Sequence, residues 1–167
     1  MSNISLFLPP GGRYSGVMFS WLFPDPLAIG SAAPEFRLPD QDGALVTLSA
    51  LRGKNVVLVF YPADETRGCR KQLCEFRDTN ELANNRGILV YGINPGSAKS
   101  HSNFRSKQNL PFPLLVDEDQ RVASLYRAKG LIVKRTVYLI NRDGIIRFAK
   151  RGKPGPAEVF NAIDIPQ

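Results

Sequence analysis

The chain of 167 residues has few of the side chains that metal sites need, with one histidine and two cysteines. Structural zinc sites usually combine four cysteine and histidine ligands, often as closely spaced CxxC pairs. We therefore expect no metal site. Two cysteines also fall short of the disulfide framework of small secreted proteins, so we expect a reducing compartment and a cytoplasmic location.

Long hydrophobic runs are absent as well. The apolar segments 4–8 and 17–23 are much shorter than the roughly 18 residues of a membrane-spanning helix. Nothing basic precedes the first of them, which argues against a signal peptide. We expect residues 1–29 to form an N-terminal extension, either a disordered tail or a mis-assigned start with Met18 as the true first residue. Residues 30–167 are expected to form one domain around one core.

The net charge of +7 would suit an anionic partner, but its distribution does not favour one. The basic residues are scattered from Arg13 to Lys153 without a run of five or six. No helix-turn-helix, zinc-finger or RNP motif accompanies them. The pattern is typical of a solvated basic surface, and we expect neither a nucleic-acid nor a membrane partner.

Both cysteines follow the most strand-like run of the chain, the β-branched and aromatic segment 56–61. Such a continuous apolar run is typical of a strand buried on both faces. Pro62 and Gly68 interrupt the extended run, and a helix is predicted from Cys69 to about Arg86. In the first turn of a helix, free backbone N–H groups and the helix dipole favour an anion. Because the thiolate is the reactive form of cysteine, this position indicates an activated sulfur.

The spacing of the cysteines points to a redox pair. Arg67, Arg70 and Lys71 add positive charge that favours the thiolate of Cys69. Cys74 follows five positions later, which separates the two Cα atoms by about 8.7 Å on an ideal helix, whereas a disulfide needs roughly 4.4–6.8 Å. The pair can bond only if the helix unwinds, which suits a cycling couple better than a permanent link. Two unrelated buried cysteines are the alternative.

This segment resembles the peroxiredoxins. Pro62, Thr66 and Cys69 stand as in the Pro-x-x-x-Thr-x-x-Cys signature of that family, directly after the predicted central strand. Cys74, followed by the Phe-Arg-Asp sequence at 76–78, is similar to the bacterioferritin-comigratory, or PrxQ-type, subgroup. The signature is specific because it fixes several residue types at several spacings.

The resemblance extends from about Ser31 to about Ile163 and includes a candidate arginine. Arg135 directly precedes a predicted strand, where a charge is costly unless it meets an anion. In peroxiredoxins an arginine at this place lies beside the reactive sulfur; the alternative is an exposed charge at a strand end. One position departs from the family, which usually has proline directly after the threonine, where this chain has Arg67.

The resemblance implies a thiol peroxidase that needs no metal or organic cofactor. Cys69 would reduce a hydroperoxide and become a sulfenic acid, with Thr66 and Arg135 holding the peroxide oxygens and Pro62 shielding the thiolate. Cys74 would then form an intramolecular disulfide with Cys69, which thioredoxin or a similar dithiol reduces. An intramolecular disulfide requires no dimer, so we expect a monomer.

Three other functions compete with this one. A thiol–disulfide oxidoreductase of the same fold would carry a CxxC motif, which is absent. A peroxide sensor or holdase would use the same cysteines with little turnover, and Arg67 is the only feature that favours it. A basic binding module would need neither cysteine. His101 is a tempting base, but a lone histidine without a neighbouring nucleophile is more often structural.

The remaining pattern predicts an α/β domain of the thioredoxin-like fold, a central mixed β-sheet flanked by helices with extra N-terminal strands. Strand 56–61, its following helix and strand 87–93 predict a parallel crossover. The turns at 42–43 and 141–144 predict hairpins. The other expected elements are strands near 34–40, 45–48, 112–117, 136–140 and 145–149, a single turn capped by Ser49, and helices starting at Ser97, Asp117 and Pro156.

Overall fold

The computed structural model describes residues 24–164, so most of the predicted N-terminal extension lies outside the described residues. The strands are β1 (Arg37–Pro39), β2 (Leu45–Thr47), β3 (Asn55–Phe60), β4 (Ile88–Asn94), β5 (Leu114–Val116), β6 (Thr136–Ile140) and β7 (Ile146–Arg151). The helices are the 3-10 helix η1 (Leu48–Leu51), α1 (Arg67–Asp78), α2 (Asn80–Asn85), α3 (Ala98–Gln108), α4 (Arg121–Leu125) and α5 (Pro156–Asn161).

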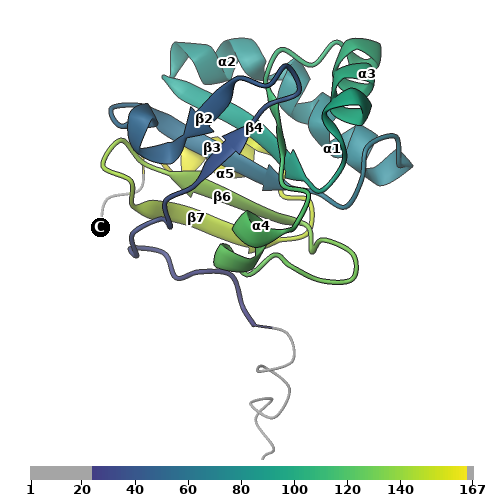
Figure 1. The fold of residues 1–167 in the computed structure, drawn as a ribbon. Helices are drawn as coiled ribbons and strands as arrows, with labels where there is room; N and C mark the ends of the chain where they lie inside the picture. The colour runs from purple at the N-terminus through teal and green to yellow at the C-terminus, as the bar shows by residue number, and fades with distance from the viewer. Residues whose placement is uncertain (1–23, 165–167) are drawn as a thin grey trace, which may run out of the picture.

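A five-stranded mixed sheet in the order β5-β4-β3-β6-β7 forms the centre of the domain (Figure 1). β3 runs parallel to β4, and β4 runs parallel to β5, as expected when helices connect successive strands. β6 and β7 join as antiparallel neighbours on the other side of β3. β1 and β2 form a separate two-stranded antiparallel sheet. The predicted mixed sheet with extra N-terminal strands is confirmed.

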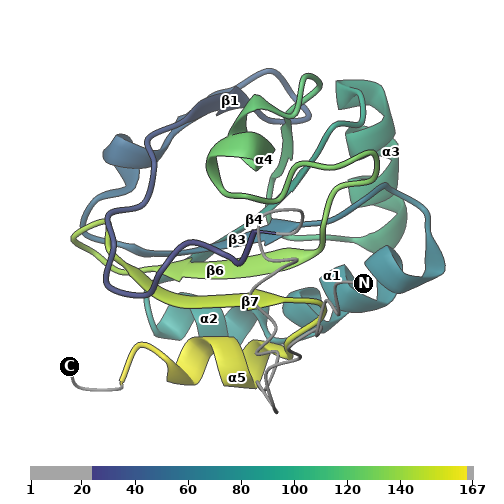
Figure 2. The same ribbon diagram turned by 90° about the horizontal axis from the view of Figure 1, so that it is seen from below.

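Both faces of β3 are buried, which explains its unbroken apolar sequence. Val56, Leu58 and Phe60 point into one core, and Val57 and Val59 point into the other. Figure 2 shows α1, α2 and α5 on one face of the sheet, with α4 and β1 on the opposite face. Because β3 is packed on both faces, the loop that follows it starts at a fixed place at the edge of both layers.

The helix predicted from Cys69 to about Arg86 is two helices, so that expectation was wrong in its extent. α1 begins two residues earlier, at Arg67, and Thr79 separates it from α2. The Thr79 hydroxyl donates to the carbonyl of Glu75 at 3.0 Å, and its backbone leaves helical geometry with φ −105° and ψ 11°. A β-branched residue that bonds to its own preceding turn competes with helix continuation.

Ser49 and Asp117 were predicted to cap helices, and only Asp117 accepts hydrogen bonds from a helix. No side-chain cap bond precedes η1, whose N-cap is Thr47, so Ser49 does not cap this turn. Asp117 accepts hydrogen bonds from the amides of Val122 (3.1 Å) and Ala123 (2.8 Å), which satisfies the first turn of α4. That carboxylate acts from outside the short helix rather than from its N-cap position.

The described residues that precede Gly30 already contact the sheet. The amide of Leu27 donates to the Tyr138 hydroxyl at 3.0 Å, and the Arg151 guanidinium donates to the carbonyl of Pro24 at 2.7 Å. The amide of Gly30 donates to Ile146 at 2.8 Å. The chain is thus held against β6 and β7 from residue 24 onward. Among residues 24–164, no helix has the length and apolar character that a bilayer crossing requires.

Candidate active site

Cys69 is the third residue of α1 and is fully buried. Thr66 precedes the helix in an extended conformation, with φ −72° and ψ 145°, and acts as its N-cap. The Thr66 hydroxyl oxygen accepts from the Cys69 amide at 3.4 Å. The sulfur therefore lies in the helix turn whose backbone N–H groups favour an anion.

Arg135 lies beside this sulfur although it is 66 residues away in the chain. Its Nη2 donates to Cys69 Sγ at 3.0 Å, and its Nη1 donates to Gln72 Oε1 at 3.2 Å. Gln72 is buried and its amide nitrogen also donates to the carbonyl of Gly152 at 3.4 Å. A guanidinium whose Nη1 and Nη2 are both hydrogen-bonded is a directional donor to a thiolate or a peroxide oxygen.

Sequence reasoning missed Gln72. Its spacing of three residues from Cys69 places both side chains on the same face of α1. This spacing was the one available signal for a residue that orients the arginine. A buried amide with both ends hydrogen-bonded also ties α1 to the end of β7.

Gly68 leaves room for two cations at the first turn of α1. A Cβ atom built on Gly68 would lie 3.0 Å from Arg135 Nη2 and 3.0 Å from Lys153 Nζ. These atoms end flexible side chains, so a methyl group would displace them at little cost in folding free energy. We expect the methyl group to break the hydrogen bond between Arg135 and Cys69 Sγ.

We predict that Gly68→Ala slows oxidation of Cys69 by hydroperoxide about tenfold, the effect of losing roughly 1.4 kcal/mol of donor alignment. The free energy of unfolding should not fall, because alanine is the better helix residue. Single-turnover oxidation and urea unfolding measure the two quantities. Gly155→Ala is the control for the oxidation rate, since a Cβ there meets nothing within 4 Å. Equal rates for all three proteins would contradict the prediction.

Pro62 and Cys74 are the two remaining predicted site residues. Pro62 is half-buried in the loop that leaves β3. Cys74 is half-buried, with its Sγ 3.7 Å from Gln108 Oε1 at the end of α3. Arg77, one turn later, donates to the carbonyl of Gln108 at 2.7 Å. Both cysteines are free thiols, and the unbroken α1 that carries them is the conformation of the dithiol form.

The loop between β3 and α1 is anchored by Asp64, which no sequence pattern singled out. Its Oδ1 accepts from the Tyr61 hydroxyl (2.8 Å) and Asn94 Nδ2 (3.0 Å). Its Oδ2 contacts Ser100 Oγ (2.6 Å) and His101 Nδ1 (2.8 Å). Burial by itself would raise the pKa of Asp64, but the hydrogen bonds from His101, Ser100 and Tyr61 outweigh it and lower the pKa.

The pKa of Tyr61 is raised, chiefly by burial, and further by the charge of Asp64 and by its hydrogen bond to that carboxylate. The charge of Cys69 adds to the same effect. Tyr61 therefore remains a neutral hydroxyl donor, and it connects the anchored loop electrostatically to the sulfur. His101 was expected to be structural, and its complete burial in this network agrees with that expectation.

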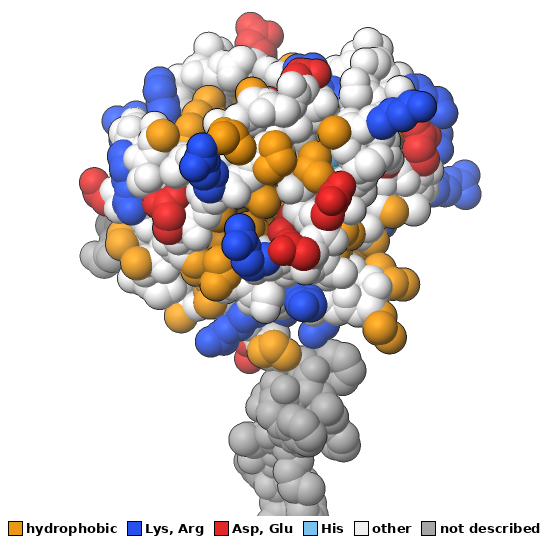
Figure 3. Space-filling view, in the orientation of Figure 1, with side chains coloured by type: hydrophobic (Ala, Val, Ile, Leu, Met, Phe, Trp, Pro, Cys, Tyr) orange, Lys and Arg blue, Asp and Glu red, His pale blue; other side chains and the backbone are white. Residues whose placement is uncertain are grey.

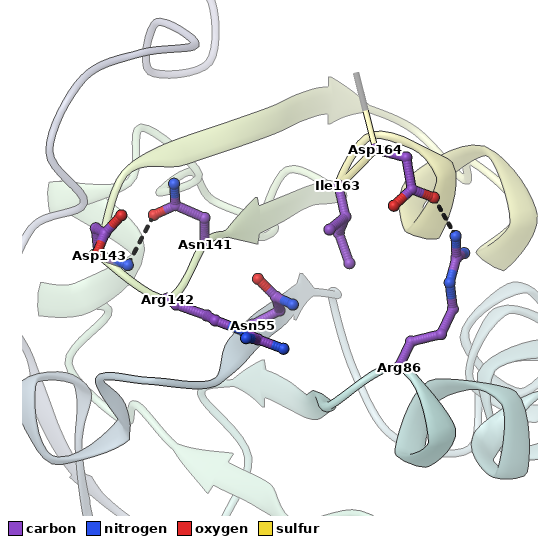
Figure 4. Close-up of a pocket in the computed structure, with 7 residues that line it drawn as sticks. All are labelled: Asn55, Arg86, Asn141, Arg142, Asp143, Ile163 and Asp164. Carbon is purple, nitrogen blue, oxygen red and sulfur yellow. Dashed lines mark hydrogen bonds and ion pairs between the residues drawn. The ribbon is translucent and has the colours of Figure 1, made fainter. Parts of the chain in front are cut away.

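A cavity of about 410 Å³ lies at the opposite end of β3, where the strand begins at Asn55 (Figure 4). Arg86 there is paired with Asp164, and the Asn141 side chain accepts from the Asp143 amide at 3.0 Å. Neither cysteine lines this cavity. Within residues 24–164, no group of three or more histidine, cysteine or acidic side chains is arranged to hold a metal ion. Both cysteines lie at the other end of β3, in the helix α1 that follows it.

Arg67, the departure from the family signature, is the first residue of α1. Proline is favoured at this position, because its fixed φ suits the helix and its missing N–H has no intrahelical partner. The residue before a proline prefers extended geometry, which Thr66 already has. Arginine places a positive charge at the positive end of the helix dipole, which is mildly unfavourable.

We therefore predict that Arg67→Pro raises the free energy of unfolding by about 0.4–1 kcal/mol, mainly by restricting the unfolded chain. Denaturant titration of the reduced protein measures the change. Arg67→Ala removes the charge without fixing φ and should give a smaller gain. A loss of stability in the proline variant would show that the loop needs a conformation that proline forbids.

Comparison with known proteins agrees with this geometry. The model of the AhpC/TSA family matches residues 29–149. The chain belongs to the AhpC/TSA family. It is 44% identical over 123 residues to the chloroplastic peroxiredoxin Q of Oryza sativa subsp. japonica, a match that covers 71% of this chain and 57% of the relative. It is 40% identical over 131 residues to the peroxiredoxin bcp of Coxiella burnetii, covering 72% and 85% of the two chains.

The fold has solved counterparts in the same family. The crystal structure of peroxidoxin BcpB from Mycobacterium tuberculosis superposes with a TM-score of 0.72 at 30% identity, covering 81% of this chain and 91% of that one. The predicted resemblance to the bacterioferritin-comigratory and PrxQ-type peroxiredoxins and the thioredoxin-like fold are confirmed. The chain spans between 57% and 66% of the length of the plant relatives that it matches.

Proposed function

We propose that this protein is a thiol-dependent peroxidase that reduces hydrogen peroxide and organic hydroperoxides. The observation that carries the proposal is the contact of Arg135 Nη2 with Cys69 Sγ at 3.0 Å, at the N-terminal turn of α1. A buried thiolate needs a cation and hydrogen-bond donors, and this site supplies both. The peroxiredoxin relatives support the same chemistry.

In the first step the Cys69 thiolate attacks the terminal oxygen of the hydroperoxide and the O–O bond breaks. The sulfur becomes a sulfenic acid, and the leaving oxygen takes a proton to become water or an alcohol. Arg135 donates to the peroxide oxygens as negative charge moves to the leaving oxygen, and Thr66 Oγ1 is the second donor. Pro62 shields the sulfur from water. Gln72 keeps the guanidinium aligned.

In the second step Cys74 resolves the sulfenic acid. The Cys74 thiolate attacks Cys69 Sγ, a disulfide forms, and the hydroxyl leaves as water. The first turns of α1 unwind to bring the two sulfurs together, because five helical residues separate them too widely for a disulfide. Cys74 leaves its contact with Gln108 in this step. A dithiol such as thioredoxin then reduces the disulfide and restores both thiols.

We extend the proposal to partners and organisation. Thioredoxin or a similar dithiol protein is the reductant, the active form is a monomer because both cysteines come from one helix, and the working domain is residues 30–167 in a reducing, cytoplasmic compartment. Basic, acidic and apolar side chains are interspersed over the face shown in Figure 3, which gives no support to a nucleic-acid partner on that face. Neither a metal nor an organic cofactor takes part in the two steps.

A peroxide-sensing role is the second candidate, and Arg67 at the first position of α1 is the feature that favours it. A less stable first turn would favour the disulfide form and slow its return to the dithiol. Such a protein would form the same Cys69–Cys74 disulfide with little turnover.

The decisive experiment follows NADPH oxidation by thioredoxin reductase and thioredoxin in the presence of a hydroperoxide, with and without this protein. We expect oxidation that depends on both the peroxide and Cys69. The mass of the reduced protein should fall by two hydrogens after one equivalent of peroxide. A disulfide without turnover would favour the sensor. If neither the disulfide nor NADPH oxidation is observed, both candidates are overturned.

A further inference from the structure

The hydrogen-bond partners of Asp64 and His101 indicate that their buried contact is an ion pair. The side chains are 3% and 0% exposed, and Asp64 Oδ2 lies 2.8 Å from His101 Nδ1. His101 Nε2 lies 3.1 Å from the carbonyl oxygen of Leu115, which can only accept a hydrogen bond. Nε2 therefore carries a proton.

The other ring nitrogen carries a proton as well. Asp64 accepts from Tyr61, Asn94 and Ser100 in addition to His101, so its carboxylate is saturated with donors and ionised. An ionised carboxylate cannot donate to Nδ1, so Nδ1 must donate to it. His101 is then an imidazolium, and the charge pair lies in the protein interior between the loop that follows β3 and the first turn of α3.

This pair is tied to the reactive cysteine through the backbone. The carbonyl of Asp64 accepts from the amide of Thr66 at 2.8 Å. Thr66 in turn caps α1 and accepts from the amide of Cys69. Fixing Asp64 to α3 therefore fixes the cap, and the cap fixes the turn that holds the sulfur.

Other contacts between α3 and this loop are weaker. Lys107 pairs with Glu65 at 3.1 Å, but both side chains are substantially exposed, at 64% and 43%. Exposed pairs contribute little, whereas removing one partner of a buried pair is strongly unfavourable. The hold of α3 on the loop rests mainly on Asp64 and His101.

We propose that Asp64 and His101 are positioning residues that hold the first turn of α1 wound and so set the balance between the two chemical steps. This inference rests on the proposed function. Reduction of the hydroperoxide needs the wound turn, in which Cys69 meets Arg135. Disulfide formation needs the unwound turn. Weakening the pair shifts the population towards the unwound state, so the two steps respond in opposite directions.

The test measures both steps separately in single-turnover experiments on His101→Gln and Asp64→Asn. We expect oxidation of Cys69 by one equivalent of hydrogen peroxide to slow about tenfold or more, and formation of the Cys69–Cys74 disulfide to accelerate. Lys107→Ala, which breaks the exposed pair on the same helix and loop, should change each rate by less than about threefold. Ser100→Ala deletes one donor and leaves both charges, so it should show the same opposite changes at smaller size.

A residue that merely stabilises the fold would behave differently. It would lower the amplitude of the reaction through a smaller folded fraction and would accelerate neither step. Unchanged rates, or equal slowing of both steps at full amplitude, would overturn the inference. If the two charge variants fail to fold, the rates of Ser100→Ala decide. If the wild-type protein does not react with peroxide, the proposed function fails and the inference with it, whereas a reactive wild type with unaltered variants overturns the inference alone.

Discussion

Cys74→Ser is expected to reduce one equivalent of hydroperoxide rapidly and then stop. Cys69 keeps its donor in this variant, because Cys74 contacts Gln108, whereas the Cys69 sulfur is contacted by Arg135. The sulfenic acid has no intramolecular partner, so thioredoxin has no disulfide to reduce. Steady-state turnover should fall to the uncatalysed background, while a pre-steady-state burst of one equivalent remains. Trapping with a sulfenic-acid reagent identifies the stalled product.

Cys69→Ser is the partner of this experiment and should lose both the burst and the turnover. Removing the nucleophile of an enzyme costs on the order of 10³-fold or more, up to about 10⁶ in well-studied cases. The helix itself should persist, because serine is compatible with the first turn that Thr66 caps. Equal residual activity in the two serine variants would rule out the separate roles of attacking and resolving cysteine.

Arg135→Gln is expected to slow oxidation of Cys69 by about 10²–10³-fold, the usual loss when one preorganised donor to a developing anion is removed. The variant loses both the charge next to the thiolate and the forked donor that Gln72 aligns. Arg135→Lys keeps the charge but not the fork and should be intermediate. Stopped-flow measurement of the second-order rate constant with hydrogen peroxide gives the comparison.

The matched control for Arg135 is Arg142→Gln. Arg142 lines the cavity at the far end of β3 and carries the same charge at a distance from the sulfur. Its rate should stay within about twofold of the wild-type value, as for most substitutions outside a site. A similar loss in both variants would indicate that overall charge, rather than the contact with Cys69, governs the reaction.

The elements that carry the cysteines could be predicted because their signals are local. The apolar run of β3, the break at Pro62 and the cysteine at the start of a helix are all properties of neighbouring residues. The end of α1 could not be predicted in the same way. Threonine occurs within many helices. The hydrogen bond from Thr79 to Glu75 ends α1 only when the surrounding packing also favours a break.

The supporting residues of the site were beyond the reach of pattern reasoning. Asp64 and His101 are 37 residues apart, and neither has a spacing that marks it as a partner of the other. Their pairing depends on the parallel register that brings the end of β3 next to the end of β4 and the start of α3. Arg135 was identified through the resemblance of the chain to the peroxiredoxins rather than from the sequence around Arg135 alone.

The placement of both cysteines in one helix has a consequence for the encounter with the reductant. A disulfide between them is incompatible with the regular turn of α1, so the oxidised and reduced proteins differ in outline at this corner of the molecule. We expect a dithiol reductant to dock on the unravelled segment. Once it has delivered its electrons, the helix rewinds and that docking surface no longer exists. We therefore expect the reduced protein to bind the reductant weakly, so that this product does not inhibit turnover.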